Sequence, residues 1–236
     1  MIQMSVCFCT LAIHPAYRQR ARLLCTDAPH VPWVILTDEP SDFSDLPVRA
    51  IQHSPTGPMA IHYLSNLTTT GEGRSAAAYH DKRFAMIAGL KDFDTVVYVD
   101  ADSRITNLPK INFFPNGLAV LPVVRNNIAE HLKTWGSWRS PFFVELARNL
   151  TGKTDILYVA PWCHEALMAL TKDGREKQFF EAWSRGAEFM QSRKVYSGEG
   201  GVVGLAAAYT GWTVDFDSLV PLSTSIQHEG GGPKTE

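Results

Sequence analysis

Short apolar runs alternate with helical stretches along most of this chain, and this alternation restricts the fold more than any other feature of the sequence. Near the beginning, a predicted strand over residues 5–11 is followed by a predicted helix over 16–24 and a second strand over 31–37. Strands joined by a helical crossover pair in parallel within one sheet. We therefore expect an α/β fold with a central, mostly parallel sheet flanked by helices.

The most apolar predicted strand lies in the middle of the chain. A loop rich in Pro, Gly and Thr, over residues 54–74, precedes a predicted helix over 75–90, which leads into Thr95–Val99. β-branched and aromatic residues fill this short segment, which indicates a central strand buried on both faces. Further along, the pattern predicts strands over 118–124, 156–160 and 212–216, and helical segments over 128–138, 141–150, 165–191 and from the Gly-rich turn at 197–201 to 209.

Composition is typical of one globular domain. The chain has 236 residues, 45% of them hydrophobic and 19% charged, with a formal net charge of -2. A chain of this length buries a large core without disulfides or metals. The near-neutral charge offers no broad basic surface of the kind that binds nucleic acid. From the order of the predicted elements we expect a single domain over 1–236, in which residues 1–105 bind a nucleotide and residues 106–236 shape a second pocket.

Two further features concern location. The first residues lack the pattern of a signal peptide, and no apolar run approaches the roughly 20 residues of a membrane span, so we expect a cytoplasmic protein without a transmembrane segment. The four cysteines show no disulfide or metal-binding spacing, and we expect them to be small buried apolar residues.

One acidic pair stands out among three Asp-x-Asp pairs, at positions 92/94, 100/102 and 215/217. Asp100 and Asp102 end the most apolar strand, and ligands of open α/β sheets bind at the carboxyl ends of strands. Residues two apart on an extended chain point the same way, so both carboxylates can bind one ion. Oxygen ligands favour Mn²⁺ or Mg²⁺ held against a diphosphate. The alternative is that these aspartates only cap and form the turn.

The segment Arg83 to Asp102, RFAMIAGLKDFDTVVYVDAD, resembles the acidic-motif segment of GT-A fold glycosyltransferases. The resemblance is strongest to the retaining family that contains glycogenin and bacterial lipopolysaccharide galactosyltransferases. Arg83 falls at the place of that family's Arg on the helix before the strand, and Arg74 at the place of a second basic residue. The resemblance implies a GT-A, Rossmann-like fold and basic side chains that contact the nucleotide sugar.

A second signature lies near the end of the chain. His228, Gly231 and Lys234 fit the family's HxxGxxK pattern, although the family continues Pro-Trp where this chain has Thr235 and Glu236. The resemblance implies that His228 is a third metal ligand, that Gly231 lets the backbone approach phosphate, and that Lys234 places a charge on the diphosphate. The alternative is a polar tail without such a role.

Glu199 is the candidate catalytic residue. It lies in the Gly-rich turn before a helix of small residues, and a Glu occupies the corresponding position in related blood-group-type retaining transferases. The resemblance implies that Glu199 acts as a nucleophile or stabilises oxocarbenium character at the anomeric carbon. One alternative is a surface Glu favoured by the helix dipole. Another is an inverting reaction in which Glu199 is the general base.

The same fold implies nucleotide contacts at the end of the first strand and in neighbouring loops. These contacts would come from Thr10, Ala12, Tyr17 and Asp38, although the family's Asp-rich pattern is missing after the first strand. Later in the chain, Trp162 could stack on a sugar, but core packing is the preferred interpretation. His164 beside it is interpreted as a structural histidine.

Together the two signatures imply a metal-dependent glycosyltransferase. It would transfer a hexose from a nucleotide sugar, with a UDP-sugar as the expected donor, to a saccharide or other hydroxyl acceptor, with retention expected first. The alternatives are an inverting transferase, a sugar-nucleotide nucleotidyltransferase, or a binding protein that keeps the metal site without catalysis. The nucleotidyltransferase alternative is weakened because no Gly-rich loop follows the first strand.

Overall fold

The computed structural model describes residues 4–56, 62–66, 69–75, 77–111, 115–121, 125–195 and 199–229, with the backbone alone described over 62–66, 69–75 and 77–78. Within these residues, every helix is too short or too polar to cross a membrane.

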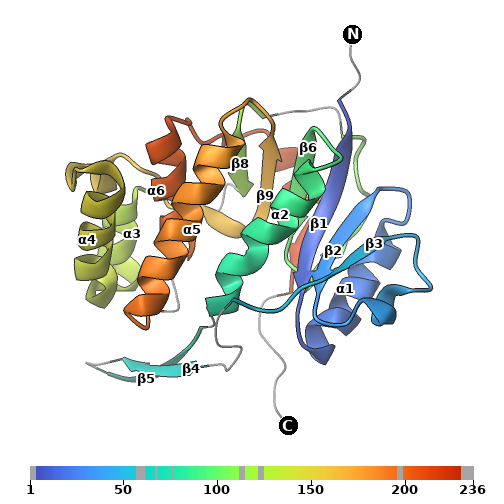
Figure 1. Cartoon of the computed structure of the whole chain (residues 1–236), viewed down its shortest axis with the longest axis horizontal. Helices are drawn as coiled ribbons and strands as arrows, with labels where there is room; N and C mark the ends of the chain where they lie inside the picture. Colours follow the sequence, from blue (N-terminus) through green and yellow to red (C-terminus); the bar gives the residue numbers. More distant parts are fainter. Residues whose placement is uncertain are drawn as a thin grey trace.

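A six-stranded sheet forms the centre of the molecule, in the order β3-β2-β1-β6-β9-β8 (Figure 1). β1 pairs in parallel with β2 and β6, β2 pairs in parallel with β3, and only β9 runs antiparallel to its two neighbours. The predicted α/β fold with a mostly parallel sheet is therefore confirmed. The strands are β1 (Val6–Ala12), β2 (Trp33–Thr37), β3 (Arg49–Gln52), β6 (Thr95–Val99), β8 (Leu118–Leu121) and β9 (His164–Thr171).

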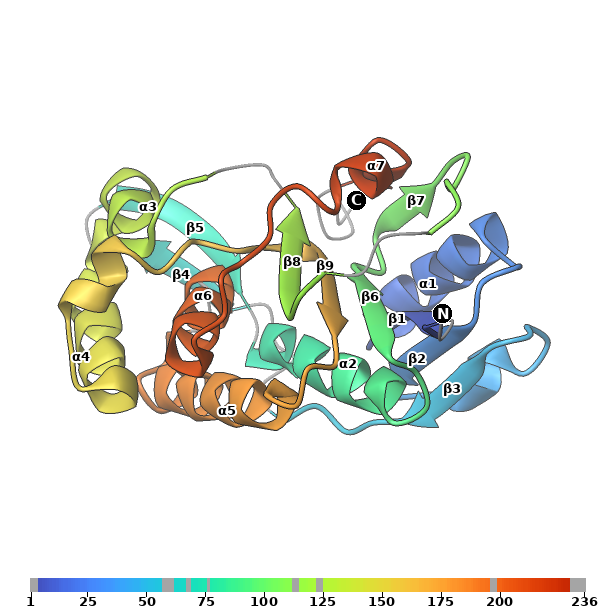
Figure 2. The same cartoon turned by 90° about the horizontal axis from the view of Figure 1, so that it is seen from above.

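Hydrophobic cores cover both faces of this sheet. All five residues of β6 are buried, and alternate side chains enter different cores: Val96 and Tyr98 one, Val97 and Val99 the other. The pleat of the strand produces this division. α2 (Lys82–Leu90) and α5 (Glu176–Ser192) cover one face, and α1 (Pro15–Asp27) covers the other (Figure 2). The predicted burial of the central strand on both faces is confirmed.

Beyond the β8 edge, helices build the other end of the molecule (Figure 1). α3 (Ile128–Trp135) begins with a capping box, in which Asn127 and Glu130 satisfy each other's backbone amides. α4 (Ser140–Thr151) and α6 (Glu199–Thr210) pack against α5. The short 3-10 helices are η1 (Pro40–Phe43), η2 (Ala77–Asp81), η3 (Ser137–Arg139) and η4 (Asp155–Tyr158).

Two small sheets accompany the central one. β7 (Ser103–Ile105) pairs antiparallel with β10 (Ile226–His228), which follows the short helix α7 (Val220–Ser223). β4 (His62–Asn66) and β5 (Thr69–Ser75) form an antiparallel pair. The loop predicted over 54–74 was therefore wrong where β4 and β5 form.

Three other predicted elements were wrong. Residues 165–171, expected to begin a helix, belong to β9 instead. Pairing on both sides with β6 and β8 outweighs the helix preference of its Ala, Leu and Met residues. The strand expected over 156–160 is the 3-10 helix η4. The strand expected over 212–216 is reduced to a single bridge at Asp215.

Candidate metal and carboxylate site

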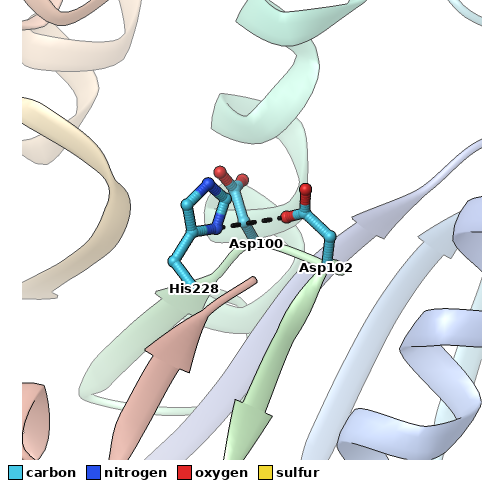
Figure 3. A group of neighbouring side chains, drawn as sticks. All are labelled: Asp100, Asp102 and His228. Atoms are coloured by element: carbon cyan, nitrogen blue, oxygen red, sulfur yellow. Dashed lines mark ion pairs between the residues drawn. The ribbon is translucent and has the colours of Figure 1, made fainter. Parts of the chain in front are cut away.

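Asp100 and Asp102 lie just beyond the carboxyl end of β6, as the sequence predicts (Figure 3). The chain turns here, with the Ser103 amide donating to the Asp100 carbonyl over 3.0 Å, before β7 begins. The Tyr98 hydroxyl donates to Asp100 Oδ1 over 3.0 Å and so holds that carboxylate toward the sheet. Asp102 is buried, whereas Asp100 is partly exposed. The turn thus places two carboxylates side by side at the edge of the core.

His228 reaches the aspartates through strand pairing. In the β7–β10 pair, His228 lies opposite Ser103, and the next amide, of Glu229, donates to the Asp102 carbonyl over 3.0 Å. The imidazole Nδ1 lies 3.3 Å from Asp102 Oδ1 (Figure 3). The hydrogen bond to Asp102 raises the pKa of His228. Burial opposes ionisation of Asp102, but this hydrogen bond and the His228 charge lower its pKa.

These three residues could hold a divalent cation. One ligand atom from each of Asp100, Asp102 and His228 lies within 4.8 Å of the other two. Carboxylates suit Mg²⁺ and Mn²⁺, whereas imidazole suits transition metals, so the mixed set fits Mn²⁺ best among the two expected ions. The imidazole side of the cluster is exposed. That exposure leaves room for oxygen ligands from a substrate.

Lys82 adds a cation that sequence reasoning missed. Its ammonium lies 3.0 Å from Asp100 Oδ1 and 4.0 Å from Glu199 Oε1. Burial disfavours its charge, but the carboxylates of Asp100 and Glu199 raise its pKa above the ordinary value. Lys82 therefore stays charged and lies between the candidate metal-binding cluster and the candidate catalytic residue.

Arg83, the basic residue expected near the diphosphate, contacts other groups. Its guanidinium donates to Ser184 Oγ over 3.0 Å and to the His80 carbonyl over 2.6 Å, and it lies 3.4 Å from Asp81. Adjacent helical residues differ by about 100° in direction, so Lys82 and Arg83 cannot face the same group. The expectation for Arg83 is therefore corrected: it fastens α2 to η2 and α5.

Glu199 begins α6 but is buried, with 8% of the residue exposed. The alternative of a solvent-exposed helix-start Glu is therefore wrong. Glu165, the second residue of β9, lies beside the start of α6, with its Oε2 2.9 Å from the position that a Cβ on Gly200 would take. Burial would raise the pKa of Glu199, but the Lys82 charge and then His80 bring it below the ordinary value. Burial and the Glu199 charge raise the pKa of Glu165 well above its usual range.

The four residues proposed for nucleotide binding at the end of the first strand and in neighbouring loops have different surroundings. Thr10 and Ala12 are fully buried in β1, and Thr10 Oγ1 has no hydrogen-bond partner within the part of the chain that the structure describes. Asp38 accepts a 2.8 Å hydrogen bond from Arg18 and lies near the start of α1. Tyr17 is half-buried and hydrogen-bonded to Tyr79.

Of these four residues, Tyr17 is the one on which the charges of the cluster act. Burial, and then the charges of Asp102 and Asp100, raise its pKa. Buried Ala12 and the ion-paired Asp38 instead have structural contacts. The side chain of Arg74, together with Gly231 and Lys234, lies outside the described residues.

Trp162 packs in the core. It stacks on His131 with ring centroids 3.5 Å apart, and it also contacts Phe143. The core interpretation of Trp162 is confirmed. His164 is partly buried at the start of β9, and burial, then the Lys82 charge, lowers its pKa. All four cysteines are buried free thiols, as expected.

Sequence reasoning missed Lys82, Glu165 and Tyr79. The signal for Lys82 was present, because it adjoins Arg83, but the helix was predicted to begin at residue 75 and begins at Lys82. Glu165 was hidden because its segment was expected to be helical.

Comparison of the chain with protein-family models and with curated proteins finds no match. The functional argument therefore depends on the site itself.

Proposed function

We propose that this protein is a metal-dependent glycosyltransferase that moves a hexose from a nucleotide sugar, expected to be UDP-linked, to a hydroxyl acceptor. One observation carries the proposal: Asp100, Asp102 and His228 converge at the end of β6, and Lys82 connects them to the buried Glu199. A cation site and an adjacent ionised carboxylate are what transfer from a nucleotide diphosphate requires. The two sequence signatures agree with this interpretation.

Each residue has a distinct role in this proposal. Asp100, Asp102 and His228 would hold Mn²⁺ or Mg²⁺. When bound there, the ion would offset the negative charge that builds up on the leaving diphosphate. The Lys82 ammonium and the Tyr98 hydroxyl both contact Asp100 Oδ1 and so orient that carboxylate. The charges of Asp102 and Asp100 act on Tyr17, which would contact the nucleotide in this proposal.

Glu199 favours retention over inversion. A general base works best when its pKa lies near the working pH, whereas the pKa of Glu199 is held below the ordinary value by Lys82, against the effect of burial. An ionised carboxylate of this kind suits a nucleophile, or a group that stabilises positive charge at the anomeric carbon. We therefore propose the retaining reaction. The four buried free thiols agree with a cytoplasmic location as part of the same proposal.

The test is a thermal-shift panel of nucleotides and nucleotide sugars, with and without Mn²⁺, on the wild-type chain and on Glu199→Gln. At a ligand concentration of 100 times Kd, binding adds about 2.7 kcal/mol of stability. We expect one UDP-sugar to stabilise both proteins only with Mn²⁺, and turnover to be lost in Glu199→Gln.

Glu181→Gln serves as the control, because Glu181 is exposed on α5 and pairs with Lys177. It should behave as wild type in both binding and turnover. If no nucleotide sugar stabilises the wild-type chain with Mn²⁺, the proposed function is wrong. Normal turnover by Glu199→Gln would remove Glu199 from the mechanism.

A further inference from the structure

Buried polar atoms without a hydrogen-bond partner gather around Trp162. In the described part of the chain six buried side-chain nitrogen and oxygen atoms lack a partner, and three of them, Asn126 Oδ1, His131 Nδ1 and Arg139 Nε, belong to residues that contact Trp162. The Trp162 amide donates to the Asn126 carbonyl over 2.9 Å, and the His131 ring stacks on the indole. The Arg139 guanidinium carbon lies 5.4 Å from the indole centroid. Because such unpaired atoms are rare in folded proteins, the surroundings of Trp162 are suited to a polar ligand.

Arg139 is the most costly of these groups to leave unpaired. Only 7% of the residue is exposed, and among the described residues its side chain makes one hydrogen bond, from Nη2 to the Trp135 carbonyl over 3.3 Å. No carboxylate of the described residues forms an ion pair with it. Burial lowers the pKa of Arg139, and the charges of Glu199 and Glu165 oppose this shift without contacting the guanidinium. Since arginine stays protonated in proteins, a buried positive charge is left without a direct counter-ion.

The local structure holds this charge in place without neutralising it. A Cβ at Gly136 would lie 2.5 Å from both Nε and Nη2 of Arg139, so the glycine leaves room for the guanidinium beside the end of α3. The guanidinium carbon also lies 6.0 Å from the centroid of the Trp138 ring. Two indole rings and a glycine therefore position the Arg139 side chain.

The Arg139 side chain lies near the candidate catalytic residue. A Cβ at Gly200 would lie 3.0 Å from Trp162 Cε2, and a Cβ at Gly201 would lie 2.9 Å from Trp162 Cζ3. The indole thus packs directly against the start of α6, whose first residue is Glu199. Arg139 contacts the same indole. A group bound at Arg139 is therefore separated by one ring from the residues that follow Glu199.

We propose that Arg139 binds an anionic group of a small-molecule ligand, a carboxylate or a phosphate, and that this ligand is the acceptor of the transfer reaction. The planar fork of N–H groups on a guanidinium matches both anions. Water would give Nε a hydrogen-bond acceptor but would not supply the missing negative charge. The first part of the proposal stands on the contacts of Arg139. The second part rests on the proposed function, in which the donor's diphosphate is bound at the cation cluster.

Three substitutions at this site change the guanidinium in different ways. Arg139→Met removes the charge, and Arg139→Lys keeps the charge without the fork. Gly136→Ala keeps every charge but displaces the guanidinium, because the new Cβ would overlap Nε and Nη2. Arg148→Met, at an exposed position of α4, is the control for loss of one positive charge. Circular dichroism identifies any variant that fails to fold, and Gly136→Ala keeps the proposal testable if Arg139→Met does.

The first measurement needs no enzymatic activity. Inorganic phosphate and acetate are titrated onto the full chain without metal, at constant ionic strength, and the melting temperature is followed. We expect one of the two anions to stabilise wild type and Arg148→Met equally, which identifies the anion as phosphate or carboxylate. Arg139→Met and Gly136→Ala should bind it at least about 10-fold more weakly, and Arg139→Lys should lose less.

Three results would overturn the anion site. The first is that neither anion stabilises wild type. The second is wild-type affinity in Arg139→Met, or in Gly136→Ala if Arg139→Met is unfolded. The third is an equal loss of affinity in Arg148→Met, which would make the binding an effect of net charge.

The second measurement is sugar transfer with Mn²⁺ and the donor found in the thermal-shift panel, to acceptors that differ in one charged group. The pairs are glucose with glucuronate, and glycerol with glycerol phosphate. We expect wild type to use the charged member of one pair with the lower KM, and Arg139→Met to lose this preference through a higher KM for that member. Equal use of both members, or transfer to the neutral ones only, would overturn the acceptor assignment. If Arg139 binds the anion but no nucleotide sugar stabilises wild type with Mn²⁺, the proposed function fails and the anion site stands.

Discussion

The ammonium of Lys82 lies 3.0 Å from Asp100, whereas the guanidinium of the next residue, Arg83, donates to Ser184 on a different helix. The two cations at the start of α2 therefore have different roles. Lys82 compensates the carboxylates of the site, and Arg83 joins α2 to α5. Both are buried, so neither can be replaced without leaving polar partners in the core.

Replacing Lys82 by Met should destabilise the protein. The change leaves the partly buried Asp100 and the buried Glu199 without their nearest cation. We expect a loss of about 2 to 3 kcal/mol in the free energy of unfolding, measured by urea denaturation near neutral pH. Lys177→Met is the control, because Lys177 is exposed on α5 and should cost less than about 0.5 kcal/mol. Equal stability of the two variants would show that Lys82 has no such role.

The cation site predicts a defined set of binding changes. Asp102→Asn and His228→Gln should each weaken Mn²⁺ binding by at least about 10-fold, because each removes one ligand or its charge. Isothermal titration calorimetry measures the affinity. Asp217→Asn, from another Asp-x-Asp pair and on the surface, should bind Mn²⁺ as wild type does. Unchanged affinity in both ligand variants would mean that the cluster is not a cation site.

Acid should destabilise the protein through His80. Its imidazole is buried, and its Nδ1 accepts a 3.2 Å hydrogen bond from Trp183, which requires that nitrogen to be unprotonated. Burial lowers the pKa of His80 to about 4. Between about pH 6.5 and this value the unfolded chain binds the additional proton, so stability falls as the pH falls, by as much as about 3 kcal/mol.

Urea unfolding at a series of pH values measures this effect. His80→Gln should lose the dependence on this histidine, whereas substitution of the exposed His30 by Gln should keep it. The assignment to His80 is contradicted if both variants lose stability in acid as steeply as wild type.

Two glycines offer a matched test of packing around α6. A Cβ at Gly204 would lie 1.8 Å from the Pro161 carbonyl oxygen, whereas a Cβ at Gly186 would meet the Val202 side chain at 2.5 Å. A backbone group cannot move aside as a side chain can, so Gly204→Ala should be the more damaging change. We expect it to cost about 3 kcal/mol, and Gly186→Ala less, in urea unfolding. The reverse order would contradict the packing of α6 against this loop.

How far the sequence predicts this structure depends on how local each signal is. The burial of β6 could be predicted because five consecutive residues suit a strand and no polar residue interrupts them. β9 could not, because its Ala, Leu and Met residues favour a helix, and only its two neighbouring strands make it extended. Short β10 is likewise stabilised by a partner distant in the sequence.

The site shows the same division. Asp100 and Asp102 were found from their place after a strand, and His228 from a family resemblance. Glu165 was missed because its element was predicted wrongly. Lys82 was missed because the family resemblance pointed to Arg83, the residue beside it.

The pairing of β7 with β10 connects the candidate cation site with the folding of the chain. His228 reaches Asp102 only when β10 pairs with β7, which lies far from it in the sequence. Closing so long a loop is entropically costly, and an ion bound by residues of both segments would oppose the separation of the two strands. Amide protons of the two strands should then exchange with solvent more slowly when the ion is bound. Ion binding and the pairing of β7 with β10 would thus stabilise each other.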